Sequence, residues 1–132
     1  MLVKQKSPGW ITRQQLAKLN MSPLQIKNQV IIPLDKVRDL GVIIDSKLTM
    51  ESHTVSVARS CFYQLRQLRS IQRSLTTDAR CTLVTAFVAN RVDYCNAVLY
   101  GTSTSVKRRL QMVLNSAARM VVGSGKYYYY YY

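Results

Sequence analysis

The hydrophobic period of this sequence changes once, near Thr49, and that change restricts the folds open to the chain. Before Thr49 the apolar residues occur in short runs, in which Leu24 and Ile26 alternate with polar neighbours and residues 30–32 are β-branched. After Thr49 the apolar residues recur every three or four positions, which is the period of an amphipathic helix. The sequence therefore predicts a mainly α fold: a three-helix bundle preceded by a short β hairpin and strand segment.

The three expected helices cover residues 50–73, 78–99 and 105–122. The second should begin at a cap formed by Thr76 and Thr77, with the carboxylate of Asp78 in its first turn. Gly123 and Gly125 should end the third helix. Apolar residues surround almost the whole second helix, as is typical of the central helix of a bundle, so we expect that helix to be the main core element.

The β segment is expected in two pieces. Residues 24–32 should form a small hairpin that turns at residues 27–29. Residues 40–44 are apolar on both faces, which favours a strand buried in a larger sheet. The chain supplies too few strands for such a sheet, so we expect this strand to lack sheet partners and to leave an edge that can pair with another chain.

These patterns predict four parts of the chain. Residues 1–23 are polar and should be disordered or form a short helix within 13–19, and residues 24–48 hold the β segment. Residues 49–123 form the helical domain. Residues 124–132 are a Gly/Tyr tail whose tyrosine homopolymer is typical of a translated simple repeat, and we expect it to be disordered.

The charge balance favours polyanionic partners. Nineteen Lys and Arg residues oppose six Asp and Glu residues, a net charge of +13 that is spread along the chain. Counterion release from phosphates is the usual use of such charge, although ribosome-like packing, a membrane surface or a non-functional translation product also fit it. On the first helix Arg59, Arg66 and Arg73 are seven residues apart and Arg69 lies on the same side, so they could follow consecutive phosphates.

The alternative for these arginines is a solvated helix edge, which amphipathic helices often carry. A second basic group, formed by Lys107, Arg108 and Arg109, falls at the start of the third helix. Cations there oppose the helix dipole, so they have little structural reason to be present. We therefore predict both groups as contacts to a nucleic-acid backbone.

No catalytic or metal-binding pattern is visible. Asp93 precedes Tyr94, but two-metal phosphoryl transfer needs neighbouring carboxylates, and the nearest acidic residue is Asp78. A buried network with Arg91 or a polar helix end explains Asp93 better. The single histidine, His53, is expected at the surface or in a cap, and three cysteines without a Cys-x-x-Cys pair indicate neither zinc nor disulfides. We expect no cofactor, no membrane span and an intracellular location.

Five blocks of the sequence, in order, resemble the region after the palm in non-LTR (LINE-type, jockey-like) retrotransposon reverse transcriptases. The similarity covers about residues 24–123, and the blocks are residues 37–45, 48–53, 61–76 (CFYQLRQLRSIQRSLT), 83–101 (LVTAFVANRVDYCNAVLYG) and 110–123 (LQMVLNSAARMVVG). The resemblance implies the end of a palm sheet followed by a helical thumb, which grips the template–primer duplex, and a nuclear location. The family's catalytic Asp-Asp box lies upstream and has no counterpart here, so the chain is expected to be a fragment that is not an enzyme by itself.

The expected function is therefore that of a remnant of an RNA-directed DNA polymerase, binding RNA or DNA duplex backbones non-specifically through thumb-like helices. Two alternatives remain at this point. One is a helical protein–protein interaction module that joins other chains through its sheet edge or apolar helix faces, and it could associate with itself through the exposed strand edge. The other is the product of a decayed element with no selected function. The residues expected to contact nucleic acid are Arg59, Arg66, Arg69, Arg73, Lys107, Arg108 and Arg109.

Overall fold

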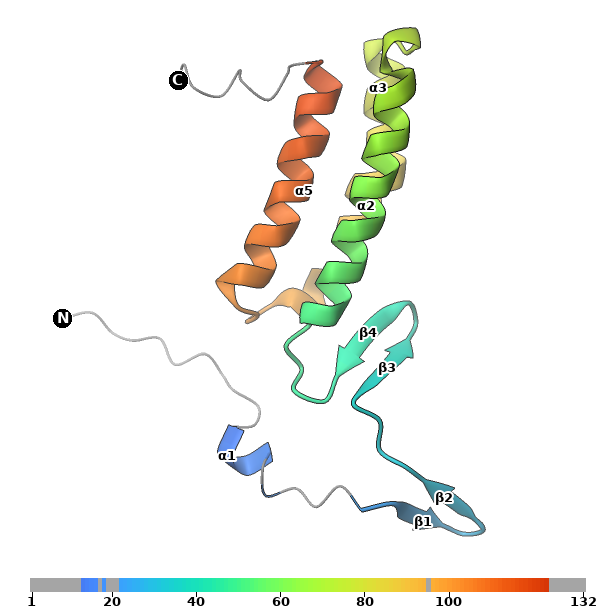
Figure 1. Cartoon of the computed structure of the whole chain (residues 1–132), viewed down its shortest axis with the longest axis vertical. Coiled ribbons are helices and arrows are strands. Elements are labelled where there is room, and N and C mark those ends of the chain that lie inside the picture. The colour runs from blue at the N-terminus through green and yellow to red at the C-terminus, as the bar shows by residue number, and fades with distance from the viewer. Residues whose placement is uncertain (1–12, 17, 19–21, 95, 124–132) are drawn as a thin grey trace, which may run out of the picture. The chain divides into compact units, whose positions relative to one another are not determined.

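The computed structural model describes residues 13–16, 18, 22–94 and 96–123. Contacts divide the chain into two units, Met1–Thr49 and Met50–Tyr132, called here the hairpin unit and the helical unit. The expectations for the rest of residues 1–23, for Cys95 and for the tail at 124–132 lie outside the described residues. Each unit is described by itself (Figure 1).

The hairpin unit contains a short helix, α1 (Arg13–Leu16), and a first antiparallel pair, β1 (Leu24–Ile26) and β2 (Gln29–Ile31). Leu24 lies opposite Ile31, and Lys27 turns the chain with φ of +53°. The predicted hairpin is confirmed. All six residues of these strands are exposed, so the hairpin is held by its ladder of hydrogen bonds and not by a core.

The second pair joins β3 (Lys36–Asp39) to β4 (Val42–Asp45), again antiparallel. The predicted strand at 40–44 is corrected here, because Leu40 and Gly41 form the turn between the strands, with φ of +45° and +83°. A two-residue turn with two positive φ angles has the twist that a tight hairpin needs. The expectation that the strand lacks a partner is also wrong, since β3 pairs with it, although within the described residues the sheet has two strands only.

The helical unit is the predicted three-helix arrangement. Its first helix is α2 (Glu51–Ile71), continued by the 3-10 turn η1 (Gln72–Ser74), and its last is α5 (Thr104–Val122). Between them the chain forms α3 (Thr77–Val84), the π-helical η2 (Thr85–Ala89), α4 (Asn90–Asp93) and the 3-10 turn η3 (Asn96–Leu99). The end of α2, the start of α3 and the end of α5 meet, so α2 and α5 run parallel and the middle segments run back between their ends (Figure 1).

The middle helix differs from its prediction in two ways. Thr76 caps α3 as expected, since its hydroxyl oxygen accepts a hydrogen bond from the Ala79 backbone N–H at 3.2 Å. The helix is not continuous, however, because η2 widens it at residues 85–89 and Tyr94, with ψ of 119°, ends it. It is also not buried all round, and Phe87 is 46% exposed.

One face each of α2, α3, η2, α4 and α5 builds the core. The most extensive helix–helix packing joins α2 and α5, and the middle segments cover one side of that pair. Their contribution is a single stripe, Val84, Val88 and Val92, at the spacing of one helical face. Within the described residues, no helix combines the length and the apolar character needed to cross a membrane. The core residues of the helical unit are Val57, Ala58, Cys61, Leu65, Leu68, Val84, Val88, Val92, Leu110, Val113, Ala117 and Met120.

Candidate nucleic-acid interface

The arginines predicted on the first helix occupy one broad face of α2. Arg59, Arg66 and Arg69 are exposed, and Arg73 is exposed in η1, after the α-helix has ended. At about 100° per residue, Arg59 and Arg66 lie on the side of α2 away from the buried stripe, and Arg69 lies at the border of that stripe. We call Arg59, Arg66 and Arg69 the basic face of α2. Along the helix axis this face is about 15 Å long.

The side chains of this face have no partner within the described part of the protein. No hydrogen bond or ion pair joins the side chain of Arg59, Arg66 or Arg69 to another described residue. By contrast, the guanidinium of Arg80 is bonded to Met120 and Thr77, and that of Arg119 to Ser116. The basic face of α2 therefore has its donors available for a ligand, whereas the other two arginines act within the fold.

Few carboxylates oppose the positive charge of the helical unit. Residues 50–123 contain ten Lys and Arg residues and three acidic residues, Glu51, Asp78 and Asp93, a net charge of +7. Exposed charges this unbalanced produce a positive potential that reaches about one Debye length, roughly 8 Å, in physiological salt. The charge therefore attracts polyanions before any contact is made.

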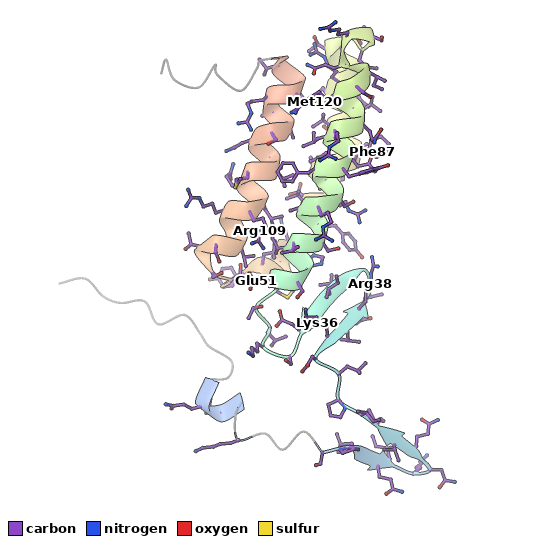
Figure 2. All side chains as sticks on the ribbon, in the orientation of Figure 1. Lys36, Arg38, Glu51, Phe87, Arg109 and Met120 are labelled. Atoms are coloured by element: carbon purple, nitrogen blue, oxygen red, sulfur yellow. The ribbon has the colours of Figure 1, made fainter. Side chains whose placement is uncertain are left out.

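The second predicted group lies on another helix, at the start of α5. Lys107 and Arg108 are exposed and Arg109 is half-buried in the first turns of α5, and the first turn of that helix contains no acidic residue. Figure 2 shows Arg109 near the end of the helical unit at which α2 begins with Glu51, while Met120 marks the opposite end. The structure does not gather all seven predicted residues into one cluster. A ligand that touches both groups would have to reach from α2 to α5.

Two aromatic residues next to the basic face were not predicted as part of it. Phe62 lies beside the buried stripe of α2 but is 37% exposed, and Tyr63 is 57% exposed. Phe62 follows Arg59 by three residues and precedes Arg66 by four, so the helical period alone could have placed it among the arginines. Neither ring contacts another ring or a cation among the described residues.

The remaining polar candidates are Arg91, Asp93 and His53. Arg91 and Asp93 are both exposed and make no ion pair, so the buried network is wrong, and Asp93 is a polar helix end because α4 stops there. His53 is buried, contrary to expectation, since it continues the stripe of Val57 and Cys61 at four-residue spacing. No group of three His, Cys, Asp or Glu side chains in the described part of the chain could hold a metal ion.

The two described cysteines differ in their surroundings. Cys61 is fully buried and Cys81 is exposed, and both are free thiols. Burial raises the pKa of the Cys61 thiol, and the positive charge of Arg91 partly opposes that shift. Cys61 is therefore held in its neutral form and behaves as a small apolar core residue.

Comparisons with known proteins found no similar family. The chain matches no protein-family model, no curated protein and no solved structure.

Proposed function

We propose that the helical unit binds nucleic acid without sequence preference, by contacting backbone phosphates with the basic face of α2 and with the cations at the start of α5. The observation that carries this proposal is that Arg59, Arg66 and Arg69 are exposed and lack partners among the described residues. Unpaired guanidinium groups can each donate two parallel hydrogen bonds to a phosphate. A solvated helix edge would not need three such groups on one face with so few carboxylates nearby.

We further propose that this unit is a thumb-like remnant of a LINE-type RNA-directed DNA polymerase. The support for this origin is the order of the five similar sequence blocks, together with a three-helix unit over the residues that they cover. Polymerisation requires metal-bound carboxylates, which in that family lie upstream of the similar region. We therefore expect the chain to bind nucleic acid and not to extend a primer.

The experiment that tests the phosphate contacts removes the charge of the basic face. Arg59, Arg66 and Arg69 are replaced together by glutamine, and binding to labelled oligonucleotides is measured by fluorescence anisotropy at several salt concentrations. The slope of log affinity against log salt should fall by about two to three units, roughly one for each lost phosphate contact. Binding should weaken equally for unrelated sequences, because phosphates carry no sequence information.

A matched control removes the same charge from the hairpin unit. Lys36, Arg38 and Lys47 are exposed, so replacing them with glutamine changes the net charge equally. The control variant should bind more weakly because its net charge is lower, but it should keep most of the wild-type dependence of log affinity on log salt. If both triple variants show the wild-type slope, the basic face of α2 does not contact the backbone, and if both lose it equally, the binding is not localised to α2.

A second candidate function is association with other chains through the hairpin unit. The observation that favours it is a set of large apolar residues on and beside β1 and β2 that are exposed although the strands are ordered. A pair of strands with uncovered edges and apolar side chains can add a strand from another chain. The exposed residues are Leu24, Ile26, Val30, Ile31, Ile32 and Leu34.

Sedimentation velocity over a range of protein concentrations distinguishes the two functions. Association through the hairpin should persist at high salt, because apolar contacts and strand pairing do not depend on counterions. Replacing Val30 and Ile31 by lysine should abolish it, since charged residues at an edge oppose strand addition. A chain that is monomeric at every concentration tested contradicts this second function.

A further inference from the structure

Resting on the proposed nucleic-acid binding, we infer that the ligand of α2 is a single strand with unpaired bases, which stack on Phe62 and Tyr63 while the arginines hold its phosphates. This inference narrows the ligand from nucleic acid in general to single strands, because phosphate contacts alone would bind a closed duplex equally well. The two rings are the feature that a backbone-only interface does not explain. Exposed aromatic rings beside unpaired arginines are the combination found in single-strand binding grooves.

The geometry of α2 places the rings among the cations. At about 100° per residue, Phe62 lies about 20° from Arg69 and about 40° from Arg66 around the helix axis. Tyr63 lies about 40° from Arg59 on the other flank. Phe62 precedes Arg66 by four residues and Tyr63 follows Arg59 by four, which is the spacing of neighbouring side chains on a helix surface.

The exposure of the rings leaves their surfaces available. Phe62 and Tyr63 make no ring contact with any described residue, and both keep a substantial accessible area. A large apolar ring held in water is unfavourable at roughly 25 cal/mol for each Å² exposed, so covering it stabilises a complex. A nucleobase covers such a ring with a flat π surface, whatever the base.

The positive charge of the helical unit favours a nucleic-acid strand over a second copy of the chain as the ligand of this face. A second copy would bring its own excess of positive charge, +7 for residues 50–123, against the basic face of α2. Like charges at short range oppose such docking, whereas a strand of phosphates neutralises them. The faces of bases in a closed duplex are already stacked on one another, so only an unpaired segment offers them to Phe62 and Tyr63.

The test compares three ligands of equal length in the full chain: an oligothymidylate strand, an abasic strand with the same phosphates, and a blunt duplex. The wild-type chain should bind the thymidylate strand roughly 5- to 150-fold more tightly than the abasic strand for each base that stacks. Replacing Phe62 and Tyr63 together by alanine should bring the two affinities together. The salt slope should not change, because no phosphate contact is lost.

Four further variants keep this test decisive. Tyr63→Ala alone removes the more exposed ring, so it changes the base preference even if alanine at Phe62 unfolds the chain. Phe62→Tyr and Tyr63→Phe keep a ring and should retain the preference. Tyr100, 88% exposed and outside α2, is the matched control, and Tyr100→Ala should leave the preference unchanged.

Equal affinity of the wild-type chain for thymidylate and abasic strands overturns the inference while leaving phosphate binding in place. So does a Tyr100→Ala chain that loses as much preference as Tyr63→Ala. A folded wild-type chain that binds none of the three ligands contradicts the proposed function as well.

Discussion

Arg80 in α3 donates a hydrogen bond from Nη1 to the carbonyl oxygen of Met120, in the last turn of α5, at 3.4 Å. Gln72 reaches the same oxygen from the end of α2, also at 3.4 Å. The last carbonyls of a helix lack partners within it and carry its negative dipole end, so a guanidinium there is favourable. Three segments of the helical unit are joined at this one carbonyl.

Replacing Arg80 by methionine should therefore lower the free energy of unfolding by about 1 kcal/mol, since a bond to a charged group is lost. Two effects keep this loss of stability small. Gln72 still donates a hydrogen bond to the carbonyl oxygen of Met120. The substitution also removes the buried Nε of Arg80, which has no hydrogen-bond partner among the described residues. Urea unfolding measures the change. Arg59→Met is the matched control, because Arg59 is exposed and makes no bond, and it should be within about 0.5 kcal/mol of wild type. Equal effects of the two substitutions would contradict the role given to Arg80.

The glycine that ends α5 provides a second prediction. Gly123 has φ of +75°, and a Cβ there would lie 3.0 Å from Nη1 of Arg80, whereas Gly101, with φ of +77°, has nothing within 4 Å. Both alanine substitutions should cost about 1 kcal/mol for the left-handed backbone. Gly123→Ala should cost more, because the arginine must move away from Met120. In a chain that already carries Arg80→Met, thermal melts should show equal losses for the two glycines.

The buried stripe of the middle helix predicts a steep contrast between valines of that segment. Val88 is fully buried, whereas Val98 is 42% exposed. Val88→Ala should destabilise the helical unit by about 2 kcal/mol, through lost burial and the cavity left behind. Val98→Ala should change stability by less than about 0.5 kcal/mol. Similar losses at both positions would indicate instead that the middle helix is surrounded on all sides, as its hydrophobic period predicts.

The raised pKa of the Cys61 thiol makes stability depend on pH in the alkaline range. The folded chain holds this thiol neutral, while the unfolded chain releases the proton near the ordinary cysteine value of about 8.5. The stabilisation is therefore fully present below that pH and is lost as pH rises through the pKa of the folded state. Unfolding free energies measured from neutral to alkaline pH should fall more steeply for the wild type than for Cys61→Ala. Parallel curves would show that the thiol is not desolvated in the fold.

Thiol labelling checks the same burial by another route. In a chain with Cys95 replaced by serine, the exposed Cys81 should react at once, and Cys61 should react only when the helical unit unfolds. Immediate labelling of both thiols in the folded chain would contradict the placement of Cys61 in the core.

The features that sequence reasoning predicted correctly depend on local chemistry. Thr76 caps α3 because its hydroxyl reaches a backbone N–H three residues later, and Gly123 ends α5 because glycine adopts a positive φ without strain. The placement of Arg59 and Arg66 on one face follows from the helical period. None of these features needs knowledge of what packs against the helix.

The errors concern long-range packing and turns inside apolar runs. The exposure of Phe87 and Phe62 depends on which faces the neighbouring helices cover, and periodicity does not contain that information. Leu40 and Gly41 were assigned to a strand because the run that contains them is apolar, although their positive φ angles make them a turn. The bond from Arg80 to Met120 joins residues 40 positions apart, a pairing that no local pattern indicates.

The central claim is that the helical unit binds nucleic acid through its unpaired arginines. The most direct measurement is an anisotropy titration of the full wild-type chain with labelled RNA, DNA and hybrid oligonucleotides over a range of salt concentrations. The account predicts saturable binding whose affinity falls steeply with salt and differs little between sequences of the same kind. Absence of saturable binding at low salt, by a chain whose circular dichroism shows folded helices, would contradict it and leave the interaction module or a product without selected function.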